Sequence, residues 1–239
     1  MEVSMNVLAI GCHPDDLEIG CGGTLALYAG KGHNVYMCHV ANGDKGHAVI
    51  MPGELGRLRT AEAVASGAIL GAKKVFNINV PDLLVDSHNE EQVKEVVEVI
   101  RAARPDVIIT HSPDDYMRDH VETSKLVFNA SFNSSIPHYY TKSESYPVIA
   151  PLFYMDTLAG VGFLPEEYTD ITDTLETKLN ALEKHGTQIK WMREHDGIDF
   201  LDFVRTVSKF RGLQCGVKYA EGFRLCKGWP RMTAKRLLP

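Results

Sequence analysis

The sequence predicts an α/β fold, a Rossmann-like three-layer sandwich with a mostly parallel sheet, in which residues 1–239 form one domain. Two observations predict it. Apolar, strand-like runs alternate with helical patterns through the first 160 residues, as in consecutive βαβ units. A group of His and Asp residues follows the first apolar run, where open α/β sheets keep their ligands. The length suffices for a substantial core.

Each expected strand is a short apolar run, and most are bounded by polar, Gly or Pro residues. The expected strands are 6–12, 34–40, 74–79, 106–110, 151–155 and 167–171. The expected helices are 18–31, 53–71, 90–103, one that begins near Asp119, 172–192 and 200–210. Right-handed crossovers in a Rossmann-like order place the first strand beside the fourth, so that their carboxyl ends share one crevice.

The first strand ends in His13-Pro14-Asp15-Asp16. Neutral His and ionised Asp suit zinc, and three protein ligands with an open fourth position are typical of a catalytic zinc. Pro14 stiffens the turn because its φ is fixed. One of the two Asp residues is enough for the metal, which leaves the other to act as a general base. The alternative is that an Asp caps the next helix while His13 only packs at the strand end.

The fourth strand leads into a second cluster, which runs from His111 to His120 and includes Asp114, Asp115 and Asp119. The expected strand order brings this cluster next to His13 and Asp16, although about a hundred residues separate the two in sequence. The two clusters together predict a metal site.

Composition limits the classes of function. The formal net charge is -6 and the 25 Lys and Arg residues are spread along the chain, so no nucleic-acid partner is indicated. No apolar run approaches the roughly 20 residues of a membrane span, and no signal peptide is visible. Five cysteines without a Cys-x-x-Cys pair favour a reduced, cytoplasmic protein. The basic stretch 227–236 is interpreted as a solvated tail.

Several segments together resemble the PIG-L (LmbE-like) zinc-dependent N-deacetylases. They are His13-Pro14-Asp15-Asp16, Glu18-Ile19-Gly20-Cys21-Gly22-Gly23-Thr24, Arg59-Thr60-Ala61-Glu62 and Asp119-His120. The segment 216–223 is similar to the C-terminal part of bacillithiol-pathway members, which act on GlcNAc-malate. The resemblance implies that His13, Asp16 and His120 bind Zn²⁺, with Fe²⁺ as an alternative, and that Asp15 deprotonates a zinc-activated water. The implied reaction removes the acetyl group from an N-acetylglucosamine-type substrate.

One position departs from the family pattern. The family has His-x-Asp-His after the fourth strand, and the first His of that motif is replaced here by Met117, which is of little use in proton transfer. Asp119 therefore loses its expected partner, and we hypothesise that His111 supplies the missing function; the alternative is a hydrogen-bonded strand-end residue. Arg59 and Tyr219 are candidates to bind substrate, although an ion pair of Arg59 with Glu62 and simple packing of Tyr219 are alternatives.

Other functions stay open at this point. They are an amidase for another N-acyl substrate, a metal-binding member without catalysis, and a nucleotide-dependent enzyme that uses Gly20, Gly22 and Gly23. The last is disfavoured because two carboxylates precede glycines that lack the Gly-x-Gly-x-x-Gly spacing. The loops 42–52 and 133–146 are expected near the site, where they would hold the group attached to the amino sugar. The resemblance also implies a homo-oligomer.

Overall fold

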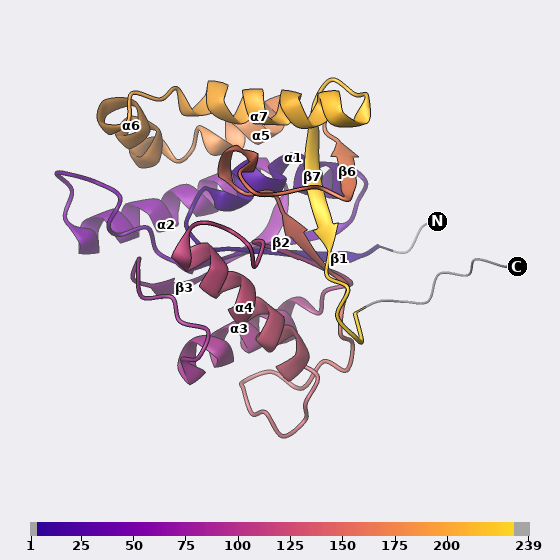
Figure 1. Ribbon diagram of the computed structural model, residues 1–239. Helices are drawn as coiled ribbons and strands as arrows, with labels where there is room; N and C mark the ends of the chain where they lie inside the picture. Colours follow the sequence, from indigo (N-terminus) through magenta and orange to yellow (C-terminus); the bar gives the residue numbers. More distant parts are fainter. Residues whose placement is uncertain (1–3, 232–239) are drawn as a thin grey trace, which may run out of the picture.

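The computed structural model describes residues 4–231 and contains one seven-stranded sheet with strand order β3-β2-β1-β4-β5-β7-β6 (Figure 1). The strands are β1 (Asn6–Gly11), β2 (Asn34–Ala41), β3 (Ala72–Val80), β4 (Val107–Thr110), β5 (Leu152–Met155), β6 (Glu167–Asp170) and β7 (Ala220–Leu225). The helices are α1 (Asp16–Gly30), α2 (Pro52–Ile69), α3 (Glu90–Ala103), α4 (Arg118–Asn133), the 3-10 helix η1 (Leu158–Gly160), α5 (Leu175–Leu182), α6 (Gly186–His195) and α7 (Phe200–Cys215). The predicted basic tail extends beyond residue 231, outside the described residues.

The strand order confirms the mostly parallel, Rossmann-like sheet. β1 pairs in parallel with β2 on one side and with β4 on the other, where Ile10 lies opposite Thr110. β7 inserts antiparallel between β5 and β6. The carboxyl ends of β1 and β4 therefore lie side by side, as expected, and the two His/Asp clusters follow from them. That all 239 residues form one domain stays a prediction.

Helices cover both faces of the sheet, which gives the three predicted layers (Figure 1). Leu8 and Ile10 of β1 point into one apolar cluster, together with residues of α3 and α4. Val7 and Ala9 point to the opposite face, where they share an apolar cluster with Leu17, Cys21 and Leu25 of α1 and with Ala181 of α5. This alternation follows from the two-residue period of a strand.

The glycines of α1 allow the helix to lie close to its neighbours. A β-carbon at Gly20 would lie 2.5 Å from Met155 Sδ, and one at Gly23 would lie 2.7 Å from Ile171 Cγ2. Larger residues at these two positions would push α1 away from the chain around β5 and β6. Close packing therefore explains Gly20 and Gly23, and no phosphate-binding role is needed to explain them.

Two expectations about the chain were wrong. The predicted helix 172–192 is divided into α5 and α6, because the chain turns at Glu183 to His185. The segment 133–146, which was expected to be a loop near the site, lies elsewhere: Arg101 at the end of α3 binds the carbonyl oxygens of Ser134, Ile136 and Ser143. The C-terminal end of α3 leads into the beginning of β4. The segment therefore lies near the amino ends of the strands, whereas the His/Asp clusters lie at their carboxyl ends. Within residues 4–231, none of the helices combines the length and the apolar character that a membrane crossing requires.

Candidate active site

The first cluster forms a tight turn between β1 and α1. Asp15 has φ 121° and ψ -28°, a conformation that is strained for a residue with a side chain. The carboxylate of Asp16 accepts a hydrogen bond from His13 N at 2.6 Å and so closes the turn. Asp15 precedes α1 but makes no side-chain capping bond. Asp15 therefore does not cap α1 through its side chain, and its carboxylate is left for other contacts.

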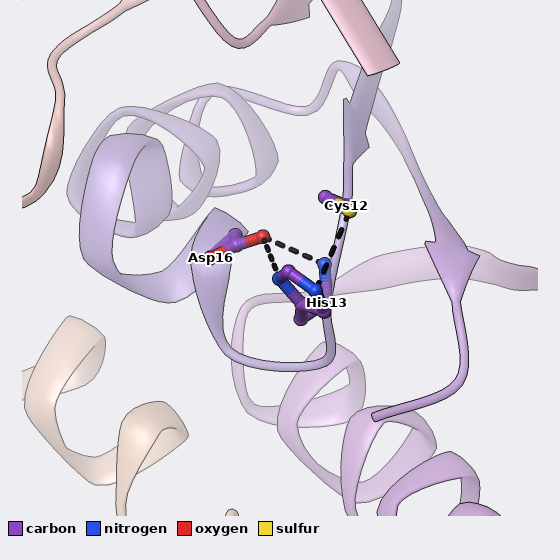
Figure 2. Close-up of side chains that lie close together, drawn as sticks. All are labelled: Cys12, His13 and Asp16. Atoms are coloured by element: carbon purple, nitrogen blue, oxygen red, sulfur yellow. Dashed lines mark hydrogen bonds and ion pairs between the residues drawn. The ribbon is translucent and has the colours of Figure 1, made fainter. Parts of the chain in front are cut away.

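Ring nitrogens of three histidines converge on the carboxylate of Asp16. Its Oδ2 atom lies 3.5 Å from His13 Nδ1, 3.2 Å from His111 Nε2 and 3.3 Å from His120 Nε2. Figure 2 shows His13 facing Asp16 across the turn, with Cys12 Sγ 3.7 Å from His13 Nε2. Within each of two groups the ligand atoms all lie within 4.8 Å of one another: Cys12, His13 and Asp16, and Asp16, His111 and His120. Asp16 is common to both groups.

His120 is oriented as a metal ligand would be. Its Nδ1 atom lies 3.1 Å from Asp115 Oδ2, and this contact directs Nε2 toward Asp16. The Nε2 atom is buried and has no hydrogen-bond partner within residues 4–231. Although burial lowers the pKa of His120, the charge of Asp16 and the hydrogen bond to Asp115 raise it to about 10. An orphaned nitrogen beside carboxylates, with a carboxylate behind the ring, fits a divalent cation.

His111 lies behind His120 rather than in the cavity. Its ring stacks on the His120 ring at 3.9 Å, and its Nε2 accepts a hydrogen bond from Cys12 N at 2.9 Å. Burial lowers the pKa of His111 to about 4, so its ring is neutral at pH 7. Because its Nε2 lone pair is directed at a backbone amide, the geometry gives no support to proton transfer by this histidine.

Asp15 and Arg59 meet in the wall of a cavity of about 200 Å³. Arg59 Nη2 donates to Asp15 Oδ2 at 3.1 Å and to Pro14 O at 2.6 Å, and Nη1 donates to Gly43 O. Arg59 therefore holds Asp15, whereas we had expected it to bind substrate or to pair with Glu62. Burial raises the pKa of Asp15 to about 6, although the charge of Arg59 acts in the opposite direction.

Asp119 contacts other groups than the family pattern implies, since the histidine of that pattern is replaced by Met117. Its Oδ2 atom lies 3.4 Å from His13 Nε2 and accepts a hydrogen bond from Leu83 N at 2.7 Å. Met117 lines the cavity. Tyr219 does not: it packs against the apolar cluster of α5 and α7. The structure thus brings His13, Asp15, Asp16, Arg59, Asp119 and His120 together and leaves Tyr219 outside.

One wall of the cavity consists of residues that were not predicted from the sequence. Leu158 of η1, Gln188 and Met192 of α6, and Phe200 of α7 line it. Nothing in the local sequence distinguishes these residues from ordinary helix residues. Asp82, which follows β3, was not predicted either; it lines the cavity and accepts hydrogen bonds from Gly43 N and Lys45 N. The rule that ligands gather at carboxyl ends of strands would have identified Asp82.

Comparison with known proteins decides the family. The family model described as PIG-L: GlcNAc-PI de-N-acetylase matches residues 8–131, which include both His/Asp clusters. The chain belongs to the PIG-L family. This confirms the resemblance drawn from the sequence.

The similarity to two deacetylases and to one further solved structure extends over nearly the whole chain. Diacetylchitobiose deacetylase of Thermococcus kodakarensis is 30% identical, with 93% of this chain and 83% of that protein covered. The solved structure of N,N'-diacetylchitobiose deacetylase from Pyrococcus horikoshii is similar with a TM-score of 0.79 at 28% identity, over 92% of this chain and 83% of that one. GalB, the 4-carboxy-2-hydroxymuconate hydratase of Pseudomonas putida, shares the fold with a TM-score of 0.80 at 21% identity, over 97% and 100% of the two chains.

Proposed function

We propose that this protein is a metal-dependent hydrolase that removes the N-acetyl group from an N-acetylglucosamine-type substrate. The observation that carries the proposal is the orphaned, buried Nε2 of His120 beside Asp16, held in place by Asp115. The family and the deacetylase relatives support the reaction. The products would be acetate and a free amino sugar.

We assign the cation to His13, Asp16 and His120, and Zn²⁺ and Fe²⁺ both suit this set of ligands. When bound, the cation supplies Lewis-acid polarisation of the acetyl carbonyl and lowers the pKa of water. Cys12 Sγ lies within the first ligand group but is buried in the apolar cluster between β1, α3 and α4. We therefore leave it out of the ligand set.

Asp15 is the general base in this proposal. With a pKa of about 6, the carboxylate is ionised at neutral pH. This pKa is also close enough to 7 for the group to accept a proton and to return it. Arg59 fixes the orientation of that carboxylate through the 3.1 Å bond and through the carbonyl oxygens of Pro14 and Gly43. Because Met117 has no proton to donate and His111 is outside the cavity, the proton that Asp15 removes from water passes from Asp15 to the leaving amine.

Asp119 and the apolar wall complete the proposed site. The carboxylate of Asp119, 3.4 Å from His13 Nε2, is placed to orient the His13 ring. Leu158, Met192 and Phe200 contribute apolar side chains to the lining of the cavity. Apolar surface near Asp15 and Asp16 lowers the local dielectric constant and so strengthens their charge interactions.

Acetate release from a panel of N-acetylglucosamine derivatives tests the reaction. We expect release from the parent protein and a loss of several orders of magnitude in Asp15→Asn, with Asp86→Asn as the exposed-carboxylate control. Metal analysis of His120→Ala should show a reduced content, whereas Asp15→Asn should keep its metal. Undiminished release from Asp15→Asn would refute the assignment of the base. Failure to release acetate from every N-acetyl sugar, combined with hydration of an unsaturated acid as in GalB, would refute the function.

A further inference from the structure

The carbonyl groups of the turn between β1 and α1 are held from outside the turn by groups of β2 and α2. Cys12 O accepts a hydrogen bond from a backbone amide of β2 at 2.9 Å, and Pro14 O accepts one from Arg59 at 2.6 Å. Between these two carbonyls, His13 O lies 3.2 Å from His39 Nδ1 of β2. Because a carbonyl oxygen can only accept, the ring of His39 carries a proton on Nδ1 and donates it.

This turn needs external support. Asp15 adopts a positive φ of 121°, and such strained conformations persist only where the surrounding structure fixes them. Inside the turn, His13 O accepts from Asp16 N at 3.3 Å, which is longer than an ordinary hydrogen bond. The donor of His39 therefore provides the shorter of the two contacts. Without it, the peptide group between His13 and Pro14 would be free to rotate, and the imidazole of His13 would turn away from Asp16.

His39 interrupts an apolar pattern in β2. Val35 and Met37 point into the apolar cluster beneath α1, and the two-residue period of a strand places position 39 on the same face. His39 is 0% exposed and lies opposite Gly11, the last residue of β1. A buried imidazole costs free energy unless its polar atoms are paired, and His39 Nε2 has no partner within residues 4–231. The bond to His13 O is thus the contact that explains a histidine at this position.

We propose that His39 is a positioning residue of the metal site. Its ring holds the carbonyl of His13 and so sets the direction in which the His13 imidazole faces Asp16. His39 is not itself a ligand in this proposal, because it belongs to none of the groups of ligand atoms that lie within 4.8 Å of one another in the described part of the chain. The inference rests on the proposed function, since that function assigns His13 to the cation.

Titration with Zn²⁺ against a competing chelator provides the first test. His39→Leu removes the donor, and we expect the dissociation constant for Zn²⁺ to rise about 10- to 100-fold. His39→Asn should recover most of the affinity, because its amide nitrogen can donate to the same carbonyl. The control is Val40→Ala, at a buried neighbour in the same strand that points to the opposite face; it creates a cavity but should leave the constant unchanged. An unchanged constant in His39→Leu, or an equal loss in Val40→Ala, would overturn the role of His39.

Amide hydrogen exchange provides a second test that does not depend on turnover. In the zinc-saturated proteins, we expect the segment 12–20 to exchange faster in His39→Leu than in the parent and in Val40→Ala. Exchange no faster than in Val40→Ala, with acetate still released by the parent, would overturn the role of His39 and leave the proposed function standing. Weaker Zn²⁺ binding and faster exchange in His39→Leu, without acetate release by the parent from any N-acetyl sugar, would support the role of His39 and refute the function.

Discussion

The ion pair between Lys178 and Glu221 should be among the most stabilising contacts in the protein. Both side chains are 2% exposed and the Lys178 Nζ to Glu221 Oε1 distance is 2.7 Å. Glu221 also accepts hydrogen bonds from Gly23 N and Thr24 N in the middle of α1, at 2.9 and 2.8 Å. Lys178 Nζ donates to Ile19 O, one turn earlier in α1, at 2.8 Å. The pair thus joins α5 and β7 to the helix that begins with Asp16.

The expected effect follows from these contacts. At 2.7 Å the attraction of the two charges is about 6 kcal/mol for an effective dielectric constant near 20, and the desolvation of both groups offsets much of it. Removal of one partner leaves the other charge buried and unpaired. We therefore expect Lys178→Met to lower the free energy of unfolding by about 3–5 kcal/mol. Adding Glu221→Gln should recover part of this loss, because the neutral amide oxygen still accepts from α1.

Equilibrium urea unfolding at pH 7, followed by far-UV circular dichroism, measures these changes. Arg205→Met is the matched control, because its pair with Glu176 is exposed, at 39% and 69%, and should contribute about 0–1 kcal/mol. A loss below about 1 kcal/mol in Lys178→Met, or one no larger than in the control, would refute the reasoning. So would a double variant that is less stable than Lys178→Met.

Three further predictions concern single positions. Asp115→Asn should weaken cation binding about 10- to 100-fold in a metal titration, whereas Asp114→Asn, at an exposed carboxylate, should leave it unchanged; equal affinities would contradict the orienting role. Gly212→Ala should lower the free energy of unfolding by about 1–3 kcal/mol, since its β-carbon would lie 2.7 Å from two backbone oxygens. Gly53→Ala should not, because a β-carbon there meets no atom within 4 Å in residues 4–231. Burial raises the pKa of Glu122, but hydrogen bonds from Lys125 and Ser87 lower it to about 2. The ionised carboxylate therefore stabilises the folded protein above about pH 4.5, and this stabilisation is lost as the pH falls toward 2. The difference in unfolding free energy between the parent and Glu122→Gln should narrow over this range; a constant difference would argue against it.

In the candidate active site, the local sequence predicts which residues lie together but not the role of each one. His13, Asp16 and His120 could be paired from sequence because each cluster follows an apolar strand, and because parallel topology places both strands' ends at one edge. The role of Arg59 could not be found in this way. A guanidinium can bind a substrate or a carboxylate, and only the fold shows that Asp15 is the group within 3.1 Å.

The sequence by itself determined the layered fold and the first four strands with their helices, because apolar periodicity is local and is repeated in each βαβ unit. It also predicted the metal chemistry that we propose for the two His/Asp clusters. The tertiary structure decided what depends on distant partners. β7 contains the buried Glu221, whose charge is balanced by Lys178 and by amides of α1, both distant in sequence. The wall formed by α6 exists because the chain turns near His185 and folds back over the cavity, which no local pattern specifies.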